Sequence, residues 1–151
     1  MDSTITDPLT TPVHRYVFVY GTLRRGQERD INRLQPSPVF IGDSKINGTL
    51  YDLGSYPGVR LGGEMWVHGE VYQITAELES QLDEIEGVWP QQTGEYVRQE
   101  LVVPGAGALL TCLIYEAAEA HTKGKAVIAS GDWVNRKFAD LTALTSSAST
   151  A

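Results

Sequence analysis

The feature of the sequence that most constrains its fold is a short run of aromatic and β-branched residues that ends abruptly at a glycine. Residues 16–20 read Tyr-Val-Phe-Val-Tyr, and residues 21–27 read Gly-Thr-Leu-Arg-Arg-Gly-Gln. Five such residues in a row predict a strand that is buried on both faces. Backbone N–H groups at the end of that strand, beside cationic side chains, suit a carboxylate, a phosphate or a developing oxyanion. The pattern also fits a plain turn with solvated charges, and its spacing matches neither a P-loop nor a dinucleotide-binding loop.

The length and charge of the chain narrow the classes of protein to which it can belong. Its 151 residues, 42% of them hydrophobic, predict one domain with a sizeable core. The net charge of −7 argues against a general affinity for nucleic acid or anionic membranes. The charges are uneven, because five of the 12 basic residues lie between positions 15 and 33. Residues 77–86, in contrast, hold five acids and no base.

The single cysteine and the absence of long apolar runs favour a cytoplasmic protein. Cys112 is the only cysteine, so no disulfide can form within the chain. It lies in the apolar run 108–115, which predicts an unreactive core thiol. No run approaches the length of about 18 apolar residues that a membrane span requires. The first residues lack the basic and apolar regions of a secretory signal.

The first half of the chain predicts a polar arm followed by strands and turns. We expect a flexible arm at 1–14, a single domain at 15–140 and a flexible tail at 141–151. His68 and Glu70 would share one face of a strand and make half a metal site, but no third candidate ligand accompanies them. The elements expected before residue 75 are a strand at 16–20, a short helix at 28–34, a strand at 39–51, turns at 54–58 and 62–63, and a strand at 65–74.

The second half predicts a capped helix and a hairpin. Thr75 is a typical helix N-cap, and Gly87 is a typical residue just beyond a helix end. Leu78, Leu82 and Ile85 are spaced as a core-facing stripe. Beyond the helix we expect a strand at 96–103, a turn at 104–107, a strand at 108–115 and a partly helical segment at 124–144. Many short strands against a few short helices predict an α+β fold, with a mixed, barrel-like sheet and the helices packed outside it.

One acid of the predicted helix differs from the others. At about 100° per residue, Glu86 falls on the rim of the apolar stripe, and it is the last helical residue. Burial, the negative end of the helix dipole and the neighbouring acids all oppose its ionisation, so we expect a raised pKa. A carboxyl group with such a pKa suits a general base or proton shuttle near neutral pH. The remaining acids are expected to form a solvated face: Glu77, Glu79, Asp83 and Glu84.

Two motifs in this order resemble the gamma-glutamylcyclotransferase-like family, especially its gamma-glutamylamine cyclotransferase and small bacterial branches. The first is the loop Val-Tyr-Gly-Thr-Leu-Arg-Arg-Gly-Gln at 19–27, and the second is Leu-Asp-Glu-Ile-Glu at 82–86. Shorter family-like segments lie at 69–72, 95–98 and 130–133. The resemblance covers residues 16–138, which is most of the chain.

The resemblance implies the fold of that family and an intramolecular aminolysis. The free α-amine of a γ-glutamyl amide attacks its own γ-carbonyl, 5-oxoproline forms, and the amine is expelled. No metal or organic cofactor is expected, because nucleophile and electrophile arrive in one molecule. The expected partner is a small γ-glutamyl substrate, and the protein would be a monomer or a homodimer. The leaving amine stays open between a Cys-Gly dipeptide, an alkylamine and a lysine side chain.

By the same resemblance, Glu86 would be the catalytic proton carrier. The backbone N–H groups after the first strand are candidates for holding the glutamyl head or its oxyanion. Arg24 either binds the substrate's α-carboxylate or is simply solvated. Trp133 is a candidate for a far wall of the cavity, while the two later tyrosines either line the cavity or pack in the sheet. The expected substrate-binding residues are Tyr20, Gly21, Thr22, Leu23, Arg24, Tyr96 and Tyr115.

Two other functions compete with the cyclotransferase. A non-catalytic module of the same fold could bind a glutamyl-like metabolite without turning it over. The presence of Glu86 favours the enzyme, because a buried carboxylate hinders the binding of an anion. A hydrolase or acyltransferase using Cys112 or a serine is disfavoured, since the chain has no Gly-x-Ser-x-Gly motif.

Overall fold

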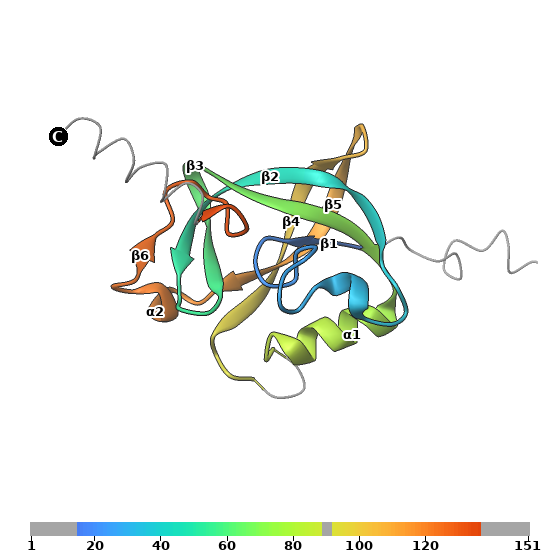
Figure 1. The fold of residues 1–151 in the computed structure, drawn as a ribbon, viewed down its shortest axis with the longest axis horizontal. Coiled ribbons are helices and arrows are strands. Elements are labelled where there is room, and N and C mark those ends of the chain that lie inside the picture. The colour runs from blue at the N-terminus through green and yellow to red at the C-terminus, as the bar shows by residue number, and fades with distance from the viewer. Residues whose placement is uncertain (1–14, 89–91, 137–151) are drawn as a thin grey trace, which may run out of the picture.

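The protein folds into one curved, six-stranded mixed sheet with helices on its outside (Figure 1). The computed structural model describes residues 15–88 and 92–136. The strand order is β4-β5-β1-β3-β2-β6, and only the pairing of β1 with β5 is parallel. The strands are β1 (Arg15–Val19), β2 (Val39–Asp52), β3 (Pro57–Ile74), β4 (Tyr96–Gly105), β5 (Ala108–Ala117) and β6 (Ala126–Val127). The helices are α1 (Ala76–Ile85), α2 (Glu119–Thr122) and a 3-10 helix at Ile31–Arg33.

The sheet curls into a half-barrel. β2 and β4 are separated by three strands in the sheet order, yet the Ser44 hydroxyl of β2 donates a hydrogen bond to the Pro104 carbonyl of β4 at 2.7 Å. The predicted α+β fold with a barrel-like mixed sheet is therefore confirmed. Within the described ranges, no helix is long and apolar enough to cross a membrane.

The strand β1 lies at the centre of the sheet, as its sequence predicts. It pairs with β3 on one side and with β5 on the other. Val17, Phe18 and Val19 are almost fully buried. Because side chains alternate along a strand, Phe18 enters the core inside the half-barrel, while Val17 and Val19 enter a second core beneath α1. The loop that follows β1 is consequently attached to a buried strand that is paired on both sides.

The hairpin of β2 and β3 corrects one predicted turn. The predicted strand at 39–51 is confirmed, but the strand predicted at 65–74 extends back to Pro57. Gly62 and Gly63 do not end a strand. They belong to a bulge, because the pairing jumps from Asn47–Trp66 to Gly48–Leu61, and residues 62–65 have no counterpart in the β2 register. Both glycines have positive φ. A pair of glycines fits a turn as well as a bulge, so the sequence alone does not distinguish the two.

The predicted ends of α1 are confirmed. The Thr75 hydroxyl accepts a hydrogen bond from the Leu78 N–H, and Gly87 follows the helix with a φ of +70°. Leu78 and Leu82 are fully buried, whereas Ile85 is only partly buried. This helix packs beside β1 and the loop after it (Figure 1). Its last turn therefore reaches the end of the central strand.

The remaining elements follow the prediction less closely. The helix predicted at 28–34 is only a 3-10 turn at Ile31–Arg33, and α2 was not predicted. The hairpin of β4 and β5 matches its prediction, with Ala106 and Gly107 in the turn. The segment expected to be partly helical from 124 contains the short strand β6 and turns within its described residues. The rest of that segment, the arm and the tail lie outside the described residues.

Candidate active site

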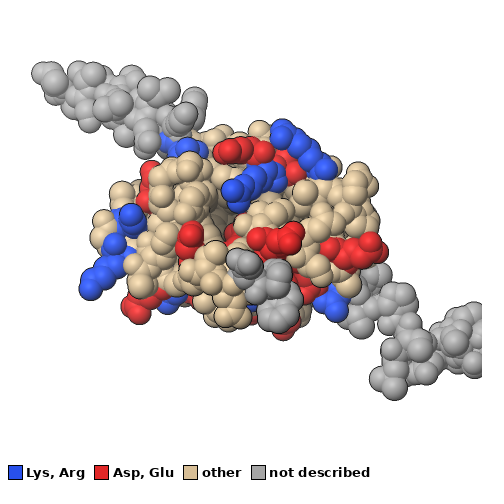
Figure 2. Space-filling model, turned by 90° about the horizontal axis from the view of Figure 1, so that it is seen from below, with Lys and Arg blue, Asp and Glu red and all other residues tan. Residues whose placement is uncertain are grey.

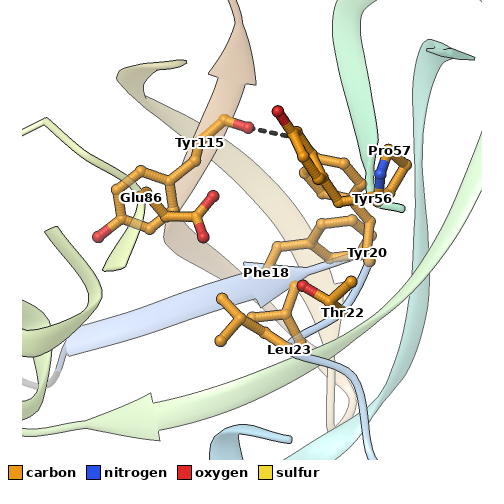
Figure 3. A pocket seen from close by; sticks show the side chains of 10 residues that line it. Phe18, Tyr20, Thr22, Leu23, Tyr56, Pro57, Glu86 and Tyr115 are labelled. Carbon is orange, nitrogen blue, oxygen red and sulfur yellow. Dashed lines mark hydrogen bonds between the residues drawn. The ribbon is translucent and has the colours of Figure 1, made fainter. Parts of the chain in front are cut away.

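A cavity opens where β1 ends, between the loop after β1 and the end of α1 (Figure 3). It encloses about 350 Å³, with open solvent at its mouth included. The carboxylate of Glu86 points into the space bordered by Tyr20, Thr22 and Leu23 (Figure 3). Two sequence motifs some sixty residues apart thus meet at one cavity. Its lining residues are Phe18, Val19, Tyr20, Gly21, Thr22, Leu23, Tyr56, Pro57, Glu86 and Tyr115.

The hydrogen bonds of the loop after β1 orient its peptide groups. The carbonyls of Gly21, Thr22 and Leu23 accept hydrogen bonds from the N–H groups of Arg24, Arg29 and Ile31 at 2.9–3.0 Å. In a planar trans peptide, the N–H lies opposite the carbonyl. The N–H groups of Thr22 and Leu23 therefore point away from these bonds, and both residues line the cavity. Such an arrangement can receive a negatively charged oxygen.

Gly21 is required at its position by close packing. A Cβ atom there would lie 2.6 Å from the Pro57 side chain, much closer than a real contact allows. Pro57 begins β3 and lines the same cavity. The absence of a side chain at Gly21 therefore lets the loop and β3 close one wall of the site.

Glu86 is the carboxyl group of the site whose pKa is shifted. It caps the C-terminus of α1 and borders both the first cavity and an adjoining hollow. Burial raises the pKa of its carboxyl group to about 7, Arg29 opposes this shift, and Glu95 adds to it. The raised pKa expected from the sequence is thus confirmed, with burial as its main cause. Near neutral pH this group can both take up and release a proton.

Glutamine at position 86 is expected to stabilise the protein only at neutral and alkaline pH. The folded-state pKa lies above the ordinary value of 4.5. The free energy of unfolding therefore loses nothing to Glu86 below about pH 4.5, and it falls as the pH rises from there through about 7. The reason is that the Glu86 carboxyl group ionises at a lower pH in the unfolded chain than in the folded one. Glu86→Gln removes this loss, so we expect a gain of about 1–3 kcal/mol at pH 8 and almost none at pH 4. Urea unfolding of both proteins at the two pH values measures it, and an equal gain at both would contradict the buried-carboxyl explanation.

Tyr20 and Tyr115 hold the inner wall of the cavity. The Tyr20 hydroxyl donates to the Tyr115 carbonyl at 2.6 Å and accepts from the Val59 N–H at 3.2 Å. The Tyr115 hydroxyl donates to the Asp83 carboxylate at 2.7 Å. Burial is the main cause that raises the pKa of each phenol above its ordinary value, so both stay neutral. Both residues line the cavity, which for Tyr115 is one of the two alternatives that the sequence left open, but their hydroxyl protons are already committed to protein acceptors.

Asp83 does not lie on a solvated face, and its prediction was wrong. It is 5% exposed and accepts hydrogen bonds from Tyr115 and from Arg98 at 2.7 and 2.8 Å. Glu79 is also mostly covered and pairs with Arg15 and Arg98. The helical wheel gave the wrong exposure for these two acids because Arg98 of β4 and Tyr115 of β5 cover this side of α1. Glu77 and Glu84 are exposed, as predicted.

The adjoining hollow is polar and encloses about 590 Å³, open solvent included. Tyr96 lies here and not in the first cavity, and its hydroxyl donates to the Pro57 carbonyl at 2.7 Å. The Tyr56 hydroxyl donates to Glu95 at 2.9 Å, and the His121 Nε2 atom lies 3.3 Å from the same carboxylate. Sequence reasoning missed this polar wall, since residues 54–58 were interpreted only as a turn. The residues lining the hollow are Thr22, Arg29, Tyr56, Ile85, Glu86, Gly87, Thr93, Glu95 and Tyr96.

Arg24 is neither solvated nor directed at the cavity. It is 8% exposed, and its guanidinium pairs with Glu70 at 3.1 Å and with Asp132 at 2.9 Å. It is not among the residues that line either hollow beside Glu86. Trp133 is likewise absent from the lining of both, and it lies in the core cluster of the half-barrel. The positive charge of the arginine-rich segment is thus partly neutralised by acids. On the face of the molecule drawn in Figure 2, acidic and basic side chains are interspersed.

The candidate metal and cysteine chemistry has no support in the geometry. Glu70 is occupied by Arg24, the Arg25 N–H and the Tyr72 hydroxyl. No group of three or more potential metal ligands occurs within residues 15–88 and 92–136. Cys112 is fully buried, and burial raises the pKa of its thiol to about 11. The prediction of a core thiol is confirmed, and a thiolate nucleophile at neutral pH is disfavoured.

The fold of the chain is similar to the folds of two solved structures. The solution structure of YtfP from Escherichia coli is 34% identical, with a TM-score of 0.56, and the match covers 81% of this chain and 98% of that one. The crystal structure of an AIG2-like protein from mouse is 26% identical, with a TM-score of 0.59, and the match covers 71% and 79% of the two chains.

The sequence comparisons identify the family. The family described as gamma-glutamyl cyclotransferase, AIG2-like, matches residues 17–135, and the chain belongs to it. A Vibrio cholerae relative, named "Putative gamma-glutamylcyclotransferase", is 41% identical over 80% of this chain and 96% of its own length. The gamma-L-glutamyl-butirosin B gamma-glutamyl cyclotransferase of Niallia circulans is 28% identical over 82% and 73% of the two chains. The predicted family is therefore confirmed, and it supports a cyclotransferase activity in general.

Proposed function

We propose that the protein converts γ-glutamyl amides to 5-oxoproline and a free amine, with Glu86 as the proton carrier. The observation that carries this proposal is the position of the Glu86 carboxylate, which faces the loop 20–23 across one cavity. The cavity shares Glu86, Thr22 and Tyr56 with the polar hollow beside it, and we assign the glutamyl group to this combined space. The polar hollow beyond Glu86 is the place we assign to the polar groups of the substrate that extend past the cavity, the leaving amine among them.

The chemistry that we assign to Glu86 is a proton transfer in two directions. The ionised carboxylate accepts a proton from the substrate's α-ammonium, which frees the lone pair of the nitrogen. The nitrogen attacks the γ-carbonyl carbon, and a new C–N bond closes the five-membered ring. As the tetrahedral intermediate collapses, the bond to the leaving nitrogen breaks and Glu86 returns the proton to that nitrogen. The regenerated carboxylate then takes a second proton from the ring nitrogen and passes it to the released amine, so two protons move in all and the amine leaves as an ammonium ion. The reaction neither gains nor loses electrons, and it consumes no water.

The loop after β1 is the proposed oxyanion site. The γ-carbonyl oxygen gains negative charge when the ring closes, and we assign it to the N–H groups of Thr22 and Leu23, which point away from the hydrogen-bonded carbonyls of the loop. The neutral rings of Tyr20 and Tyr115 would exclude water and hold the substrate in its curled conformation. Catalysis would then depend mainly on positioning, because both reacting groups belong to one molecule.

A direct assay tests the proposed function. The purified protein is incubated with γ-glutamyl alkylamides, γ-glutamyl-ε-lysine and γ-glutamyl-Cys-Gly, and 5-oxoproline is measured by chromatography. Formation of 5-oxoproline with an equal amount of free amine supports the proposal. Binding of these compounds, detected as a thermal shift without any turnover, would favour the non-catalytic metabolite-binding module instead.

The pH dependence of this activity is expected to follow the ionisation of Glu86. Since the carboxyl group must be ionised to accept a proton, kcat/KM should rise about tenfold per pH unit below pH 7. The curve should flatten above pH 7, because the pKa of Glu86 is about 7. Initial rates at low substrate concentration between pH 5 and 8 measure this profile. A profile that is flat over this range would contradict the assigned role.

A further inference from the structure

Arg29 is the cation that the fold places beside the proposed proton carrier. It lines the polar hollow together with Glu86 and Thr22. Its backbone N–H donates to the Thr22 carbonyl at 2.9 Å, which fixes residue 29 against the loop 20–23. Its positive charge lowers the pKa of Glu86 against the larger effect of burial, so the guanidinium and the carboxylate lie within electrostatic range. Arg29 is therefore held at the site by its backbone, while its side chain is exposed.

The other arginines of this segment are occupied elsewhere. Arg15 pairs with Glu79, Arg24 pairs with Glu70 and Asp132, and Arg25 lies 3.9 Å from Asp43. Arg33 donates to the Glu28 carbonyl. The Arg29 guanidinium forms no ion pair within 4.0 Å with any acid in the described part of the chain. Of the five, Arg29 is thus the one with a charge available to a ligand in the hollow.

We propose that Arg29, rather than Arg24, binds the α-carboxylate of the γ-glutamyl substrate. The inference rests on the proposed function. In a glutamyl group the α-ammonium and the α-carboxylate are attached to the same carbon atom. When the ammonium reaches Glu86, the carboxylate must lie only a few Å away, on the side where Arg29 stands. A guanidinium can bind a carboxylate through two parallel hydrogen bonds, which would also fix the rotation of the substrate.

This assignment also resolves a conflict of charges in the site. An ionised Glu86 would repel the substrate's carboxylate, and Glu95 adds further negative charge to the hollow. Arg29 supplies the compensating positive charge. Substrates or products that lack the α-carboxylate should therefore bind weakly and should not respond to the loss of Arg29.

The test compares two rings that differ only in the carboxylate. Binding of 5-oxoproline and of 2-pyrrolidinone to the wild type, Arg29→Gln and Arg33→Gln is measured by NMR titration at pH 8. We expect Arg29→Gln to weaken 5-oxoproline binding about 10- to 100-fold and to change 2-pyrrolidinone binding less than about twofold. Arg33→Gln, which removes a charge from the same segment, should change neither. In kinetic assays, Arg29→Gln should raise KM with little change in kcat, and Arg29→Lys should restore part of the loss.

The possible failures are distinguishable. If the wild type binds 5-oxoproline and Arg29→Gln binds it equally well, the assignment of Arg29 is wrong while the proposed function stands. An equal weakening of both rings by Arg29→Gln would also overturn the assignment, because it would indicate a general disturbance of the site. If the wild type binds neither ring and forms no 5-oxoproline, both the assignment and the proposed function are wrong.

Discussion

Replacing Glu86 by glutamine is expected to lower kcat/KM for a γ-glutamyl amide about a thousandfold. Glutamine has nearly the same shape but can neither accept the proton of the α-ammonium nor return one to the leaving nitrogen. General acid–base groups contribute about 10²- to 10⁴-fold to a rate, and this single group is assigned both transfers. The loss should fall on kcat, because the substrate's binding contacts are unchanged. Initial rates of 5-oxoproline formation at pH 8 measure the effect.

The matched control for this experiment is Glu84→Gln. Glu84 lies two residues earlier on α1, but its side chain is exposed on the solvated face. Its replacement removes the same charge and should change kcat/KM by less than about twofold. If Glu86→Gln retains more than about a tenth of the wild-type activity, Glu86 is not the proton carrier, even if the reaction itself is correct.

Replacing Arg24 by methionine is expected to destabilise the protein by about 3–5 kcal/mol. The change leaves the carboxylate of Glu70, which is 3% exposed, without its charged partner. Removing one partner of a buried ion pair typically has a cost of this size, because the remaining charge is neither solvated nor compensated. The ion pair with Asp132 is lost as well. The free energy of unfolding in urea at pH 7 measures the effect.

Arg25→Met is the control for this second prediction. The Arg25 side chain is exposed, and it lies 3.9 Å from an exposed Asp43. Exposed pairs of this kind contribute about 1 kcal/mol or less. Its backbone N–H, which donates to Glu70, stays in place in this variant. Equal destabilisation by the two variants would mean that the buried pair of Arg24 and Glu70 does not anchor the loop.

Local patterns in the sequence predicted those elements that depend on local chemistry. The unbroken apolar run at 16–20 identified the central strand, and Thr75 with Gly87 identified both ends of α1. The position of Glu86 at the rim of the apolar stripe predicted its raised pKa. In each case the signal behind the prediction, whether an apolar run, a helix cap or a helical spacing, lies within a few residues along the chain. The family resemblance predicted that two motifs distant in the sequence meet at one site, and residues of both line one cavity in the structure.

The errors concern residues with partners far away in the sequence. Arg24 pairs with acids 46 and 108 positions away, and Asp83 bonds with Arg98 and Tyr115 from the β4–β5 hairpin. No pattern within the loop or the helix distinguishes such buried charges from solvated ones. Gly62 and Gly63 were assigned to a turn because a bulge and a turn both require positive φ. The sequence places Arg29 only within a group of basic residues. Its position beside Glu86 depends on the folded loop and is not predicted by that pattern.

The most direct test of the central claim is a crystal structure of the Glu86→Gln variant with an intact γ-glutamyl amide. The variant should bind the substrate without turning it over. We expect the γ-carbonyl oxygen to lie within hydrogen-bond distance of the Thr22 and Leu23 N–H groups, with the α-amino nitrogen against the side chain of residue 86. A substrate bound at another surface, or one whose α-amino group points away from residue 86 into solvent, would contradict the account.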